Sequence, residues 1–165
     1  MSWARVYGAD WDRAWAECPR GDWLLGIAVR AGGDPRQVVE GACACARFAF
    51  EYLPESEHRP RAAVEAAEAW VEGDDDAAGR ARLAVEIEAL VDDAPDPAVG
   101  AAAMAALAAL RSVQTPEDAP HAAASAVQAA LLDAGDCAMM AAMRHAQAVC
   151  ADLVRRHLDQ PALRG

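Results

Sequence analysis

Alanine supplies about a quarter of the residues and recurs at three- and four-residue steps along much of the chain. Alanine has the highest intrinsic helix propensity, and small apolar residues at this spacing fall on one face of an α-helix. No run alternates apolar and polar side chains in the way a half-buried strand would. The sequence therefore predicts an all-α protein.

Proline and glycine mark where these helices begin and end. Proline is favoured in the first helical turn, where its missing N–H group has no partner to lose, and Gly73 fits the left-handed position after a helix end. The proline steps are Asp34-Pro35, Arg59-Pro60, Asp96-Pro97 and Thr115-Pro116. Together these signals predict helices near residues 9–17, 22–31, 35–53, 60–72, 76–94, 97–112, 119–134 and 136–159.

A length of 165 residues suits one domain with one hydrophobic core. Short turns between the predicted helices favour a compact multi-helix bundle or a short stack of antiparallel helical hairpins, with about seven to eight helices. We expect a single all-helical domain over residues 1–165, with an aromatic-rich front half (1–73) and an alanine-rich back half (74–165). The uncharged run from Ala98 to Leu110 predicts a helix surrounded by other helices.

Every aromatic residue lies within the first seventy positions. Trp11 and Trp15 are four residues apart on one face of the predicted first helix, with Trp3, Tyr7 and Trp23 close in sequence. We interpret this group as an aromatic knot packed into the core, where large rings bury much apolar area. An exposed rim that contacts another protein is the alternative, since Trp and Tyr are frequent in binding hot spots.

The negative charge is concentrated in one segment. The chain carries a net charge of −11, and residues 55–96 hold thirteen Asp or Glu against four Arg. Such a field repels the phosphate backbone of nucleic acids and steers the protein toward a basic partner. A solvated acidic surface that only keeps the protein soluble is the alternative.

Sequence features also bear on location. The first twenty residues mix charged and apolar side chains, unlike a signal peptide, and the longest uncharged run is too short for a membrane span of about 20 residues. We therefore expect a cytoplasmic protein with no membrane partner and with free thiols rather than disulfides. The cysteines are Cys18, Cys43, Cys45, Cys137 and Cys150.

No catalytic or cofactor motif stands out, because the chain has neither a Gly-x-Ser-x-Gly elbow nor a glycine-rich phosphate loop. Soft ligands gather in the last predicted helix, but Cys137 and Cys150 lie about 20 Å apart along a helix and cannot bind one ion. We expect a non-enzymatic protein without cofactor or metal, and keep a soft-metal-binding helical bundle as a weaker alternative. The stripe assigned instead to a methionine-rich core face is Met139, Met143, Ala146, Cys150, Leu153 and His157.

The stretch from Cys18 to Gly73 resembles immunity proteins found with bacterial polymorphic toxins. The resemblance is carried by Cys18–Leu25 (CPRGDWLL), Ala42–Arg47 (ACACAR) and Arg59–Gly73 (RPRAAVEAAEAWVEG), which are apolar and helix-start positions rather than catalytic motifs. It implies an all-helical protein that binds and blocks a toxin domain. The chain has no Lys, no Asn and a single Thr, as GC-rich codon usage produces, and this composition fits a bacterial source.

Candidate contact residues come from the acidic segment. Three glutamates share one face of the predicted helix 60–72, and three aspartates follow directly. We name this set the acidic stripe, and in a toxin-neutralising protein it would steer the encounter with a basic toxin domain. A structural or adaptor helical module is the alternative function, and the sequence leaves the oligomeric state open. The acidic stripe is Glu65, Glu68, Glu72, Asp74, Asp75 and Asp76.

Overall fold

Helices account for most of residues 10–159, the part of the chain that the computed structural model describes. None of these residues forms a strand, so the all-α prediction is confirmed. No helix in this range combines the length and apolar character that crossing a membrane requires. The elements are α2 (Trp11–Glu17), α3 (Gly21–Arg30), α4 (Pro35–Phe48), the 3-10 helix η1 (Ala49–Tyr52), α5 (Arg59–Glu72), α6 (Ala77–Asp92), α7 (Pro97–Arg111), the 3-10 helix η2 (Pro116–Asp118), α8 (Ala119–Asp133) and α9 (Gly135–His157).

The helix starts follow the aspartate and proline signals. Asp34 and Asp96 each precede a proline, and each side chain accepts a hydrogen bond from the backbone N–H two residues on, at 2.9 and 2.7 Å. Asp10 and Asp76 also cap their helices through side-chain hydrogen bonds. These bonds satisfy donors that a helix start leaves unpaired. At the other end of α5, Gly73 adopts the left-handed conformation with φ of 107°, which stops the helix.

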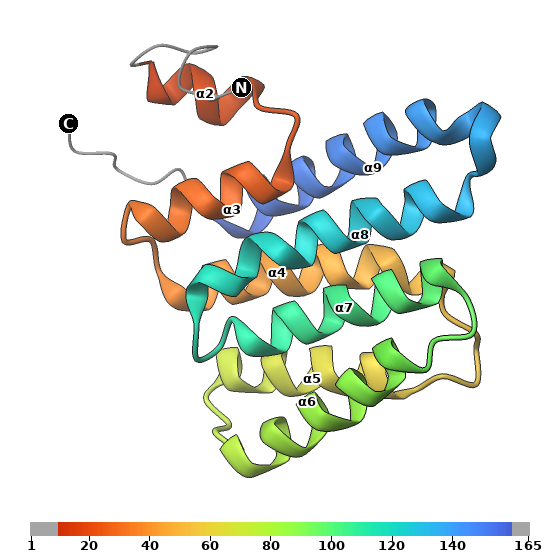
Figure 1. Ribbon diagram of the computed structural model, residues 1–165. Coiled ribbons are helices and arrows are strands. Elements are labelled where there is room, and N and C mark those ends of the chain that lie inside the picture. The colour runs from red at the N-terminus through yellow and green to blue at the C-terminus, as the bar shows by residue number, and fades with distance from the viewer. Residues whose placement is uncertain (1–9, 160–165) are drawn as a thin grey trace.

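The helices form two packed layers (Figure 1). α9, α4 and α5 lie side by side in one layer, and α3, α8, α7 and α6 lie side by side in the other. α6 contacts α5, α7 contacts α5 and α4, and both α8 and α9 contact α4 and α3. In a simple stack each unit contacts only its neighbours in sequence, so this arrangement is a compact bundle.

α7 runs through the middle of the bundle. It contacts α4, α5, α6 and α8, and every residue from Ala98 to Leu110 except Met104 is buried. Alanine permits this because small side chains let neighbouring helix axes approach to about 8 Å. The prediction of an uncharged helix surrounded by others is confirmed.

Aromatic rings contribute less to the described core than the sequence suggests. Trp15 is buried and Trp23 is half-buried against the core. Trp3, Tyr7 and the side chain of Trp11 lie outside the described residues, so the aromatic knot is described only in part. Most of the buried side chains are Ala, Val, Leu and Ile from both halves of the sequence.

All five cysteines are free thiols, as predicted, and Cys137 alone among them is exposed. Burial raises the pKa of the Cys43 thiol, and hydrogen bonding to Cys150 together with burial raises the pKa of Cys45. Both thiols therefore stay protonated. In that form they pack in the core as small apolar side chains.

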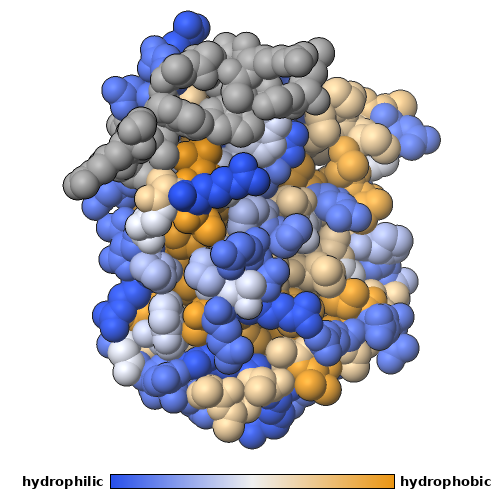
Figure 2. Space-filling view, turned by 60° about the vertical axis from the view of Figure 1, so that its left-hand side comes forward, coloured by the Kyte–Doolittle hydropathy of each residue, from blue (hydrophilic) through white to orange (hydrophobic). Residues whose placement is uncertain are grey.

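Hydrophilic and hydrophobic side chains are interspersed over the face shown in Figure 2. Single exposed apolar residues are normal on a monomer, whereas a contiguous apolar patch marks a binding surface. The large hydrophobic side chains that are exposed within residues 10–159 are spread over four helices, namely Val85 on α6, Met104 on α7, Leu132 on α8 and Met140 on α9.

Candidate functional site

The acidic stripe lies along α5 and the turn that leads into α6. The opposite side of α5 packs into the bundle through Ala63, Val64 and Ala67, which are fully buried. The glutamates of the stripe therefore face outward, as the periodicity of this helix predicts. Of the six residues, Glu65, Glu72, Asp74, Asp75 and Asp76 are exposed and Glu68 is half-buried.

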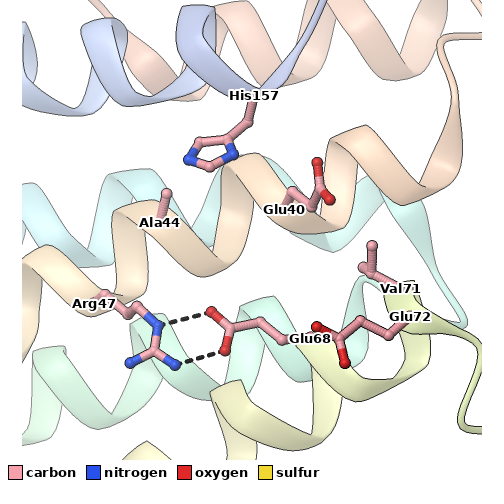
Figure 3. A pocket seen from close by; sticks show the side chains of 7 residues that line it. All are labelled: Glu40, Ala44, Arg47, Glu68, Val71, Glu72 and His157. Atoms are coloured by element: carbon pink, nitrogen blue, oxygen red, sulfur yellow. Dashed lines mark hydrogen bonds and ion pairs between the residues drawn. The ribbon is translucent and has the colours of Figure 1, made fainter.

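Glu68 is bound by an arginine of the neighbouring helix. Arg47 of α4 donates from Nε and Nη2 to the two carboxylate oxygens of Glu68, at 2.7 and 2.5 Å (Figure 3). This hydrogen bonding raises the pKa of Arg47. The side chains of Arg47 and Glu68 remain 44% and 35% exposed, so the pair contributes about 1 kcal/mol or less to stability. Its bidentate geometry fixes the direction in which Glu68 points.

Two of the three aspartates in the turn between α5 and α6 serve the fold. Asp76 caps α6 by accepting a hydrogen bond from the Gly79 N–H at 2.9 Å. Asp75 accepts a hydrogen bond from Nη2 of Arg80 at 2.5 Å. The Arg80 side chain is only 6% exposed, and its Nε and Nη1 have no hydrogen-bond partner within the described part of the chain. Asp75 therefore neutralises a buried charge that would otherwise be costly.

The other three residues of the acidic stripe form no ion pair within the described part of the chain. Within residues 10–159, no ion pair involves Glu65, Glu72 or Asp74. All three side chains are exposed on the same edge of the bundle. The structure thus separates the acidic stripe into carboxylates that hold the fold and carboxylates that stay open to a partner.

A groove lies beside the stripe, between α4, α5 and the last turn of α9 (Figure 3). Its volume of about 280 Å³ is near the lower limit for small-molecule pockets, which suits one side chain of a partner. Three carboxylates line it together with one guanidinium, already bound to Glu68, and one imidazole, so its net charge is negative. The lining residues are Glu40, Ala44, Arg47, Glu68, Val71, Glu72 and His157.

The sequence identified Glu68 and Glu72 but not the residues that face them. Placing His157 on the core face of the last helix was wrong, because His157 is exposed and points from α9 toward α4 (Figure 3). The apolar stripe ends earlier, with Cys150 buried and Leu153 half-buried. Glu40 lies on the polar side of α4, a local signal that could have marked it as accessible.

No group of three or more His, Cys, Asp or Glu side chains is placed to hold a metal ion among residues 10–159. Comparisons with protein-family models, curated proteins and solved structures give no match.

Proposed function

We propose that this chain is a non-enzymatic binding protein that neutralises a bacterial toxin by covering a basic surface of the toxin domain. The observation that supports this most is the set of exposed carboxylates on one edge of the bundle, Glu65, Glu72 and Asp74, which no ion pair occupies within the described residues. Like charges held together repel one another, and a basic partner would relieve that repulsion. The resemblance of residues 18–73 to immunity proteins agrees with this function.

The groove gives the proposed contact a specific position. Glu40 and Glu72 stand on its two sides, on α4 and α5, and each can accept hydrogen bonds from an arginine or lysine of the toxin. Arg47 holds Glu68 in place, so part of the groove is ordered before the partner arrives. A preformed site loses less conformational entropy on binding.

The exposed carboxylates outside the groove would act on the rate of association with the toxin. Charges at the rim of an interface change the association rate and its salt dependence more than the final affinity. Glu65 and Asp74 would therefore steer a basic toxin toward the groove. A protein with this role acts where the toxin is made, so we place it in the cytoplasm.

Co-expression with the product of the adjacent gene tests the proposed function. We expect that product to be toxic alone, and to be tolerated and co-purified as a stable complex when this chain is present. A Glu65→Arg/Glu72→Arg variant should lose both rescue and complex. The matched control is Glu55→Arg/Asp133→Arg, which makes the same change in net charge at two exposed residues outside the stripe.

The control variant should rescue as well as the unmodified chain. Equal rescue by both variants would contradict a contact between the acidic stripe and the toxin. A neighbouring product that forms no complex with the unmodified chain would remove the proposed function itself.

A further inference from the structure

One face of α9 is covered by another helix over only half of its length. In the C-terminal half, the first residue of α3, Gly21, lies so close that a Cβ atom there would stand 2.8 Å from the backbone carbon of Cys150. Cys150, Ala151 and Val154 are fully buried in this half. In the N-terminal half, none of residues 135–145 is buried. The part of the α9 surface that α3 covers therefore ends where α3 begins.

Figure 1 shows why the N-terminal half is uncovered. α9 runs out past the start of α3, with α8 beside it. The side of α9 that carries Met139 and Ala142 is half-buried within the bundle. The side that continues the α3-covered face carries Asp136, Met140 and Arg144 at four-residue intervals, all of them exposed. We name these three residues the α9 stripe.

The α9 stripe is complementary to a second copy of itself. Met140, 57% exposed, stands at its centre. Asp136 and Arg144 each lie four residues from Met140, or about 6 Å along the helix axis. In an antiparallel pair of α9 helices related by a two-fold axis at Met140, Asp136 of each copy therefore meets Arg144 of the other. Such an interface is isologous, because the same surface serves both copies.

The charge distribution of the molecule favours this face for self-association. A net charge of −11 opposes the approach of two copies, and the segment 55–96 carries most of it. Figure 1 places α5 and α6 at the opposite end of the bundle from α9. Around the α9 stripe, Asp133 and Asp136 are offset in part by Arg144, so the local net charge is small. Repulsion between two copies is therefore weaker at this face than at the end formed by α5 and α6.

We propose that this chain forms a two-fold dimer in which the N-terminal halves of α9 pack antiparallel about Met140. One helix crossing of about three turns buries less surface than the 1,200 to 2,000 Å² of a stable interface, so the dimer is weak on its own. The groove lies at the other end of α9, beside His157, and remains open in both copies. Dimerisation thus adds to the proposed function and does not depend on it.

Disulfide trapping tests the dimer, because it captures weak association. The Cys137→Ser background removes the exposed native thiol, and Met140→Cys places one new thiol at the two-fold axis. Oxidised glutathione converts two such thiols to a disulfide and is itself reduced to glutathione. The bond requires Cα atoms within about 7 Å, which only a contact at this position gives. The control is Val85→Cys in the same background, at an apolar residue that is more exposed, at 65%.

We expect the Met140→Cys protein to form covalent dimers at least about tenfold faster than the Val85→Cys protein. Adding Asp136→Arg should slow trapping severalfold, and adding Arg144→Asp as well should restore the rate. Equal trapping at the two positions would overturn the proposal. Failure of the charge swap to restore the rate would overturn the antiparallel arrangement.

Discussion

α5 and α7 have similar lengths and begin with similar signals, yet the fold uses them in opposite ways. Both carry proline in the first turn and several alanines. α7 buries twelve of its fifteen residues, whereas α5 buries four of fourteen. The difference lies in the glutamates of α5, which cannot be enclosed without a large desolvation cost. α7 is therefore the centre of the core and α5 its edge, so changes in α7 should affect stability and changes on α5 should affect binding.

The largest effect is expected from a charge placed in α7. Ala106 is fully buried, so Ala106→Glu should destabilise the protein by more than about 4 kcal/mol or prevent folding. Met104→Glu on the same helix is the control, because Met104 is 40% exposed and its replacement should cost less than about 1 kcal/mol. Urea denaturation measures both. Similar midpoints for the two variants would contradict the central position of α7.

Close helix packing outside α7 can be tested at two glycines of α3. Gly21→Ala should cost about 1 to 3 kcal/mol, because the new Cβ would stand 2.8 Å from backbone and side-chain carbons of Cys150. Gly26→Ala should instead stabilise the protein by about 0.5 to 1 kcal/mol, since the nearest atom lies at 3.8 Å and alanine favours the helix. Thermal unfolding of the two variants gives the sign of each change in stability. Two stabilised variants would mean that α3 and α9 are less tightly packed than described.

Asp76 and Asp74, which lie in the same turn, test the distinction between carboxylates that stabilise the fold and exposed carboxylates without an ion pair among the described residues. Asp76→Ala removes the cap of α6 and should destabilise the protein by about 1 kcal/mol. Asp74→Ala makes the same charge change two residues earlier and should stay within about 0.5 kcal/mol of the unmodified chain. Asp74→Ala should weaken binding to the proposed toxin partner more than Asp76→Ala does. Equal losses of stability would argue that the turn acts as one charged unit.

The smallest effect concerns the acid stability of the loop before α5. Arg59 donates hydrogen bonds to Glu57 at 2.8 and 2.6 Å and so lowers the pKa of that carboxyl group. The stabilisation is complete above the unfolded-state pKa of about 4.3 and is lost as the pH falls through the lower folded-state value.

Glu57→Gln should therefore flatten the fall in unfolding free energy between about pH 5 and pH 3. Arg59→Gln should flatten it less, because it removes the guanidinium while the backbone N–H of residue 59 still donates to Glu57. Denaturation across this pH range measures both slopes, and a Glu57→Gln slope equal to that of the unmodified chain would contradict the pairing.

Local chemistry accounts for what the sequence could predict. Asp34 and Asp96 mark helix starts because a cap and its N–H partner are two residues apart. The burial of Ala98 to Leu110 follows from the absence of charge over that run. These signals need no knowledge of which helices are neighbours.

The groove could not be predicted in this way because it depends on distant pairs. Arg47 meets Glu68 across 21 positions of the chain, and His157 arrives from the last helix. Alanine faces are nearly alike, so they do not specify which helix packs on which. Only the assembled layers place Glu40 opposite Glu72.

The most direct test of the central claim is the association rate with an inactive form of the proposed toxin partner, measured by stopped flow at low and high salt. We predict that Glu65→Arg/Glu72→Arg lowers the rate at low salt by about tenfold or more and weakens its salt dependence. Glu55→Arg/Asp133→Arg, with the same net charge, should stay within about twofold of the unmodified chain. Equal rates for the two variants would contradict binding through the acidic edge of α5.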